Sequence, residues 1–117
     1  MQVVNLTPHP ITYENSEGVR IVFETSGTIA RIDQSDPVPL EGENFPFRVV
    51  EHPSWGEVEN LPPYKEGTML IVSSLVLAHC VGRDDVFAPA TGPAHGCIRN
   101  MRGHIQAVTA FIAAPGA

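Results

Sequence analysis

Proline and glycine are spread so densely along this chain that few regular elements can be long. Its 117 residues include 11 prolines and 10 glycines. Proline lacks an amide donor and fixes its own φ, and glycine favours turns, so both residues interrupt helices and strands. The sequence therefore predicts many short strands joined by turns, and it argues against a helical bundle.

Alternating apolar residues predict the clearest pair of strands. In residues 19–24 the side chains of Val19, Ile21 and Phe23 share one face, which is the period of a strand. Residues 15–18 have turn chemistry and join this segment to residues 11–14, so we predict a hairpin. Further strands are predicted at residues 2–6, 28–32, 45–51, 68–72, 97–99 and 104–112, with an exposed loop or flap at 33–44 and an irregular connection at 57–64.

The longest apolar run follows Gly67 and predicts a buried strand and then a helix. Ser73 or Ser74 can cap the helix, because a hydroxyl before an apolar run satisfies free amides. We place this helix at about residues 74–81. The predicted fold is a single domain, residues 1–117, of mainly β or α+β class, with an antiparallel or barrel-like sheet and one short helix.

Charge is distributed unevenly along the chain. Residues 1–66 carry 4 basic and 11 acidic side chains, a net of −7, whereas residues 67–117 carry 3 basic and 2 acidic ones, a net of +1. The total of −6 disfavours non-specific binding of nucleic acid. No apolar run approaches the roughly 18 to 20 residues that cross a bilayer, and the N-terminus lacks signal-peptide character, so we expect a soluble cytoplasmic protein without a membrane partner.

The loop predicted at residues 85–100 is the first candidate site. Glycine turns can present amides to an anion, and arginine adds a planar fork for phosphate or carboxylate. We expect a pocket for an anionic small molecule, formed by Arg83, Asp84, Thr91, Gly92, Arg99, Asn100 and His9. The alternative is that Arg83 pairs with Asp84, Asp85 or a loop carbonyl, and that the glycines only turn the chain.

Cysteine and histidine residues offer two further readings. A zinc ion would be held by members of the set His79, Cys80, His95, Cys97 and His104, although no paired-ligand motif occurs among them. Cys97 could instead act as a nucleophile with His95 or His104 as its base. We predict neither a metal site nor a catalytic residue, and two cysteines are too few for a disulfide framework.

Several blocks of sequence have a familiar order. The chain opens with Val4-Asn5-Leu6-Thr7-Pro8-His9-Pro10-Ile11, and distinctive blocks follow at residues 56–62, 67–73, 82–86, 89–93 and 98–100. Over nearly the whole chain these blocks resemble a family of small proteins carried by tailed bacteriophages and prophages. The chain departs from that pattern at residues 94–97. The resemblance implies a phage-encoded protein in the host bacterial cytoplasm, and it does not imply a chemistry.

A compact acidic phage protein without an enzyme motif is typical of accessory factors that counteract a host defence. We expect a non-enzymatic protein, without a cofactor, that sequesters a small anionic, nucleotide-derived signal. Because subunit boundaries supply deeper pockets than one small domain does, we also expect a homo-oligomer. Three alternatives stay open: an inhibitor that covers a host protein surface, a minor virion structural protein, and a zinc- or cysteine-dependent hydrolase.

Overall fold

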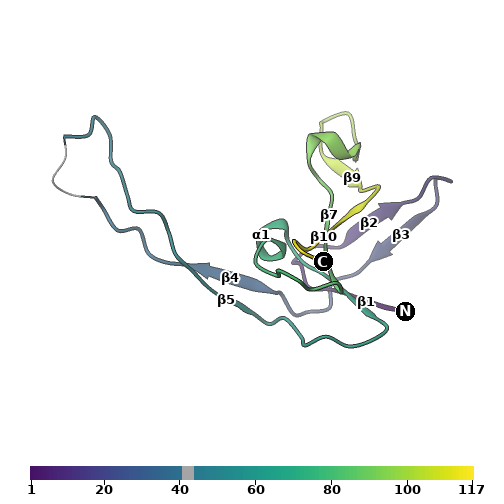
Figure 1. Ribbon diagram of the computed structural model, residues 1–117. Helices are drawn as coiled ribbons and strands as arrows, with labels where there is room; N and C mark the ends of the chain where they lie inside the picture. The colour runs from purple at the N-terminus through teal and green to yellow at the C-terminus, as the bar shows by residue number, and fades with distance from the viewer. Residues whose placement is uncertain (41–43) are drawn as a thin grey trace.

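A four-stranded sheet lies at the centre of the molecule (Figure 1). The computed structural model describes residues 1–40 and 44–117. The strand order is β1 (Gln2–Asn5), β6 (Thr68–Ile71), β7 (Val86–Pro89) and β10 (Phe111–Ala113). The first three strands are parallel, and β10 runs antiparallel to β7. The predicted mainly β fold with one short helix is confirmed, but the sheet is mixed rather than antiparallel, and the described strands form no closed barrel.

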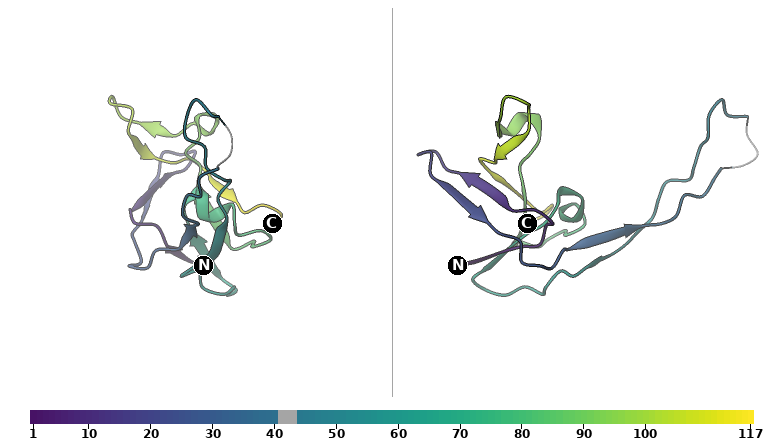
Figure 2. Two further views of the ribbon diagram at one scale, coloured as in Figure 1. Left: turned by 90° about the vertical axis from the view of Figure 1, so that its left-hand side faces the viewer. Right: turned by 180° about the vertical axis from the view of Figure 1, so that it is seen from behind.

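Three hairpins extend from this sheet in different directions (Figures 1 and 2). They pair β2 (Ile11–Glu14) with β3 (Arg20–Phe23), β4 (Arg31–Gln34) with β5 (Trp55–Glu59), and β8 (Ile98–Arg99) with β9 (Ile105–Ala107). The first and third hairpins are joined next to the sheet. There the amide of Val108 donates to the Thr12 carbonyl at 2.8 Å, and its carbonyl accepts from the Glu14 amide at 2.9 Å.

The main core lies between one face of the sheet and helix α1 (Ser74–Leu77). Leu70 of β6 and Val86 and Ala88 of β7 are buried there with Val76 and Leu77 of the helix. Ile32 and Val58, at the base of the β4–β5 hairpin, pack against the same cluster. Burying such side chains contributes roughly 1.5–3 kcal/mol each, so this face supplies much of the stability of the fold.

Helix α1 is shorter than the eight residues predicted at 74–81. The Ser73 hydroxyl accepts from the Val76 amide at 3.3 Å and so caps its start, as expected from the sequence. After Leu77 the amides of His79 and Cys80 bond to carbonyls three residues back, and Gly82 follows with a φ of 81°. These tighter turns end the helix, because a left-handed glycine cannot continue it.

Six other predicted elements require correction. The strand at 28–32 is displaced to β4, and the strand at 104–112 divides into β9 and β10 because Val108 pairs with the β2 side instead of continuing the ladder. The connection at 57–64 overlaps strand β5, and the loop at 85–100 contains β7. Residues 45–51 contribute only a bridge between Val50 and Pro39. The predicted loop at 33–44 begins inside β4, and its residues 41–43 lie outside the described part of the chain.

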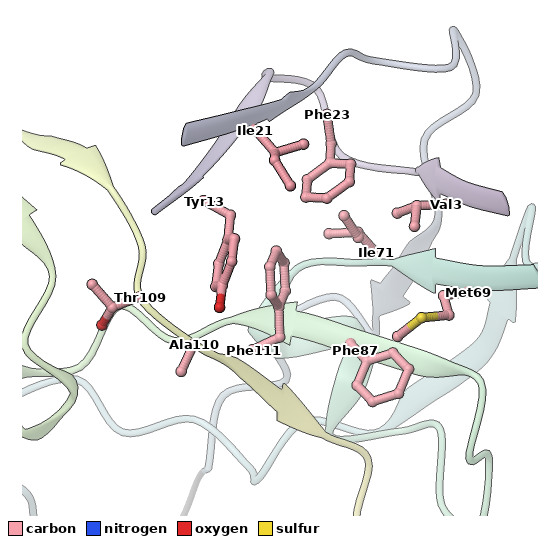
Figure 3. Close-up of a pocket in the computed structure, with 10 residues that line it drawn as sticks. All are labelled: Val3, Tyr13, Ile21, Phe23, Met69, Ile71, Phe87, Thr109, Ala110 and Phe111. Carbon is pink, nitrogen blue, oxygen red and sulfur yellow. The ribbon is translucent and has the colours of Figure 1, made fainter. Parts of the chain in front are cut away.

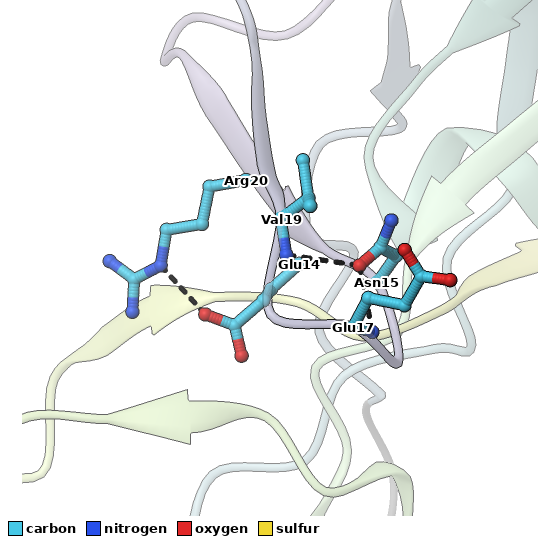
Figure 4. A network of polar contacts seen from close by, with 5 residues as sticks. All are labelled: Glu14, Asn15, Glu17, Val19 and Arg20. Atoms are coloured by element: carbon cyan, nitrogen blue, oxygen red, sulfur yellow. Dashed lines mark hydrogen bonds and ion pairs between the residues drawn. The ribbon is translucent and has the colours of Figure 1, made fainter.

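Two hairpin tips are built by the same turn. The Asn15 side-chain oxygen accepts from the amides of Glu17 and Val19 at 2.9 and 3.0 Å (Figure 4). The Asn100 oxygen accepts from the residues at the same offsets, Arg102 and His104, at 2.9 and 3.0 Å. In both turns the fourth residue is a glycine with a φ near +80°. The shared pattern, Asn-x-x-Gly-x, therefore fixes the β2–β3 and β8–β9 tips by local bonds.

A buried polar network holds the N-terminal corner. The Asn5 side chain is 1% exposed, and its amide nitrogen donates to the carbonyls of His9 and Phe23, both at 2.9 Å. Its oxygen accepts from the amide and the hydroxyl of Thr7 at 2.9 and 2.7 Å. The Asn-Leu-Thr-Pro-His stretch thus turns the chain from β1 into β2, which assigns it a structural role.

Candidate functional site

The second face of the central sheet is apolar and only partly covered. Side chains alternate along each strand, so the neighbours of the core residues point away from α1. Val3 pairs with Met69 across β1 and β6, and Ile71 pairs with Phe87 across β6 and β7. Phe111 of β10 lies on the same face. A sheet with two apolar faces needs a cover on each side, and this chain supplies α1 for only one of them.

The β2–β3 hairpin shelters part of this face and leaves a pocket (Figure 3). The Phe111 ring lies between those of Tyr13 and Phe23, with ring centroids 6.0 and 6.1 Å away. Aromatic rings at such distances attract one another and hold a fixed arrangement. The open cavity has a volume of about 470 Å³. It is lined by Val3, Tyr13, Ile21, Phe23, Met69, Ile71, Phe87, Thr109, Ala110 and Phe111.

The chemistry of the pocket is that of an apolar binding surface. Its lining includes no charged side chain, cysteine or histidine. Tyr13 and Thr109 supply its two side-chain hydroxyls, and that of Thr109 donates to the His95 carbonyl at 3.1 Å. Sites with aromatic walls and few polar groups bind apolar ligands, with the polar groups fixing orientation. This pocket is therefore suited to an apolar or aromatic group, and its lining has no positive charge to hold an anion.

Arg83, the first residue expected to bind an anion, is engaged within the fold. Its guanidinium donates to both carboxylate oxygens of Asp85 at 2.8 Å and to the Pro62 carbonyl at 3.0 Å. Asp85 is buried, and the hydrogen bonds from Arg83 hold the pKa of this carboxyl below its usual range. Arg83 thereby connects the segment before β6 to the start of β7. This pairing is the alternative to an anion site that the sequence left open for Arg83.

The other residues predicted to form the anion site are dispersed. Arg99 lies in β8 and donates to the Gly103 carbonyl at 2.8 Å. The side-chain oxygen of Asn100 accepts hydrogen bonds from two amides of the adjacent turn. Thr91 and Gly92 follow the opposite end of β7 from Arg83 and Asp84, and Gly92 precedes a 3₁₀ turn at Pro93–His95. The exposed His9 contributes its carbonyl to the Asn5 network. The structure therefore does not bring Arg83 and Arg99 together around one of its principal cavities.

Both cysteine thiols are engaged with backbone carbonyls. Cys80 donates to the Val76 carbonyl at 3.2 Å, and Cys97 donates to the Ala90 carbonyl at 2.9 Å. Burial raises the pKa of the Cys80 thiol. Residues 1–40 and 44–117 contain no group of three side chains placed to hold a metal ion. The two cysteines thus serve as buried or half-buried donors to backbone carbonyls.

The pocket was not predicted from the sequence, although the apolar strand at residues 68–72 indicated a second apolar face of the sheet. Residues 68–72 are apolar at nearly every position, which indicates a strand buried on both faces. The matching strand β7 lies in a region whose mixture of Gly, Pro, Thr, Asp and Arg predicts a loop. Comparisons with protein-family models, with curated proteins and with solved structures found no match to this chain.

Proposed function

We propose that the protein is a non-enzymatic binding protein whose apolar pocket receives an aromatic-bearing segment of a partner protein. The single observation that supports this proposal is the open apolar face of the central sheet between β1 and β10. Filling the pocket removes its lining from water, and a buried aromatic anchor is the usual centre of a protein interface. A phage setting in the host cytoplasm remains part of the proposal and rests on the sequence resemblance.

This proposal corresponds to one of the alternatives expected from the sequence, an inhibitor that covers a host protein surface. It requires a preformed apolar socket and no catalytic group, which fits the lining residues. A partner segment would also cover Ile21, which is 47% exposed at the lip of the pocket. Exposed apolar side chains next to a cavity are typical of protein-interaction sites.

Selection of short displayed peptides against the purified protein tests the proposal. We expect enrichment of sequences with an aromatic residue on the wild type and loss of that enrichment on Ile21→Asp. The matched control is Val22→Asp, which changes the next residue of β3, is similarly exposed at 51% and does not line the pocket. Equal recovery on the wild type and on Ile21→Asp would contradict the proposal.

A second candidate function is the sequestration of a small anionic signal at the β8–β9 tip. Arg99 and Arg102 line a shallow hollow with Asn100, Met101 and Gln106, and no acidic residue lines it. Two guanidinium groups at one hollow favour a phosphate or carboxylate. Calorimetric titration with cyclic dinucleotides should give binding heat that Arg99→Ala removes, and an absence of heat with the wild type would count against this candidate.

A further inference from the structure

We infer that the aromatic segment bound by the pocket belongs to a second copy of this chain, whose Phe47 side chain enters it. This inference rests on the proposed function, because it names the partner for the same pocket. The donor is the β4–β5 hairpin, residues 31–59, which we call the arm. Contact between the arm of one copy and the pocket of the next would link copies of the protein.

The described residues of the arm, 31–40 and 44–59, extend far from the rest of the molecule (Figure 1). The chain measures 58 Å along its longest axis and 27 Å along its shortest. Beyond the β4–β5 ladder, three backbone hydrogen bonds of 2.7–3.0 Å continue the pairing. The amides of Ser35, Leu40 and Glu51 donate to the carbonyls of Ser54, Val49 and Val38, respectively. The described residues of the arm therefore remain paired with each other away from the core.

This pairing leaves large apolar side chains in water. Phe47 is 69% exposed, and Val38, Leu40, Phe45 and Val50 are exposed as well. A two-stranded hairpin without a covering layer is marginally stable in water, and exposed aromatic side chains make it less favourable. Such an arm gains stability when a second surface covers it.

The arm cannot reach the pocket of its own chain. In opposite views, the arm and the β2–β3 hairpin that shelters the pocket lie on opposite sides of the body (Figures 1 and 2). At its base, Trp55 packs on His79 with ring centroids 5.2 Å apart, and Ile32 and Val58 are fixed on the core. These anchors direct the arm outward, so a pocket that receives it must belong to another molecule.

The charges of the two regions are complementary. Residues 31–59 carry two basic and seven acidic side chains, so the net charge of the arm is 2 minus 7, or −5. The β8–β9 hairpin, residues 97–107, carries Arg99 and Arg102 and no acidic side chain. Thr109 and Ala110, which follow this hairpin, form one rim of the pocket. Opposite charges steer association, so the arm should approach along the β8–β9 side.

The sizes also agree. A phenylalanine side chain buries roughly 150–250 Å² when it is covered, and cavities that hold ligands enclose about 300–1,000 Å³. The pocket, at about 470 Å³, accommodates one aromatic ring with its neighbouring backbone. Contact between two different surfaces of identical chains is heterologous, so it extends from copy to copy into a ring or a filament.

A complementation experiment tests the inference. Sedimentation velocity from micromolar to millimolar concentration should show reversible self-association of the wild type. Phe47→Ser removes the aromatic ring that enters the pocket, and Ile21→Asp places a charge in the apolar lining of the pocket. Each variant should raise the dissociation constant of self-association at least about tenfold. A mixture of these two variants should form a heterodimer that grows no further, because only one working arm and one working pocket can meet. Val22→Asp, which lies outside the pocket, should associate like the wild type.

The outcomes separate this inference from the proposed function. A wild type that stays monomeric at millimolar concentration, or a mixture that forms no heterodimer, overturns the inference. If peptides still bind the pocket of such a monomer, the proposed function stands and the partner is a different protein. If they do not bind, both fail. Melting temperatures of the variants equal to that of the wild-type monomer would show that loss of association is not loss of folding.

Discussion

Replacing Asn5 by alanine should be among the most destabilising single substitutions in this chain. The side chain makes four hydrogen bonds at 2.7–2.9 Å and is 1% exposed, so water cannot replace it. Three backbone groups lose a partner in the variant: the Thr7 amide and the carbonyls of His9 and Phe23. The network ties β1 to the start of β2 and to the end of β3, and its loss therefore affects the cover of the pocket.

The magnitude follows from the number of bonds. Each intramolecular hydrogen bond contributes about 1 kcal/mol, and burying a group without its partner costs about 1–3 kcal/mol. We therefore expect Asn5→Ala to lower the free energy of unfolding by about 4 kcal/mol, out of a total of roughly 5–15 kcal/mol for a domain. Thr7→Val, which at similar volume removes the hydroxyl proton shared between the Asn5 side-chain oxygen and the His9 carbonyl, should cost about 1–2 kcal/mol.

Urea denaturation followed by tryptophan fluorescence measures both variants. Trp55 is the single tryptophan of the chain and packs against His79 beside α1, so its emission should report loss of the core. The slope of the transition should stay constant if the folded states are equally compact. If Asn5→Ala lowers the free energy of unfolding by less than about 1 kcal/mol at an unchanged slope, the hydrogen bonds of Asn5 do not stabilise the fold as argued.

Four further measurements test other parts of the fold. Arg83→Ala leaves the buried Asp85 carboxylate without its partner and should cost about 2–4 kcal/mol in urea denaturation at neutral pH. Because the folded-state pKa of Asp85 is depressed, the pair stabilises fully above about pH 5 and is lost as pH falls below about 4; an equally steep acid transition in Arg83→Ala would exclude this cause. Gly103→Ala, at a φ of 81° with open space around it, should cost about 1 kcal/mol by the same assay through backbone strain alone, and no cost would mean a different turn. Under native conditions iodoacetamide should alkylate Cys97 faster than Cys80, which is buried with a raised pKa; mass mapping that finds the reverse would contradict this packing.

Local features of the fold were accessible from the sequence. Strand 11–14 is found where predicted, and Asn15 and Gly18 form the turn expected between β2 and β3. The cap at Ser73 was also predicted, because capping depends on a few adjacent residues. These successes share a cause: the bonds that decide each element join residues close together in the chain.

Features that depend on distant residues were missed. The pocket combines side chains from residues as far apart as Val3 and Phe111. No spacing in the sequence indicates that these side chains lie around the same pocket. The pairing of Arg83 with Asp85, two residues away, is a different case: the sequence offers this pair as the alternative to an anion site, and spacing alone does not decide between the two. Strand 104–112 was predicted as one element because apolar residues continue through it, whereas pairing of Val108 with the β2 side divides it.

The parallel pairing of β1 with β6 has a consequence for how the protein is made. Gln2 pairs with Thr68, so the first two partners of the central sheet are 66 positions apart in the chain. At a synthesis rate of about 5–20 residues per second, roughly 3–13 s pass between the synthesis of β1 and that of its partner strand β6. During that interval the two nearest-neighbour hairpins can close, since they need no later sequence. The nascent polypeptide thus carries an unsatisfied N-terminal strand on the ribosome, where early chaperone contact would protect it.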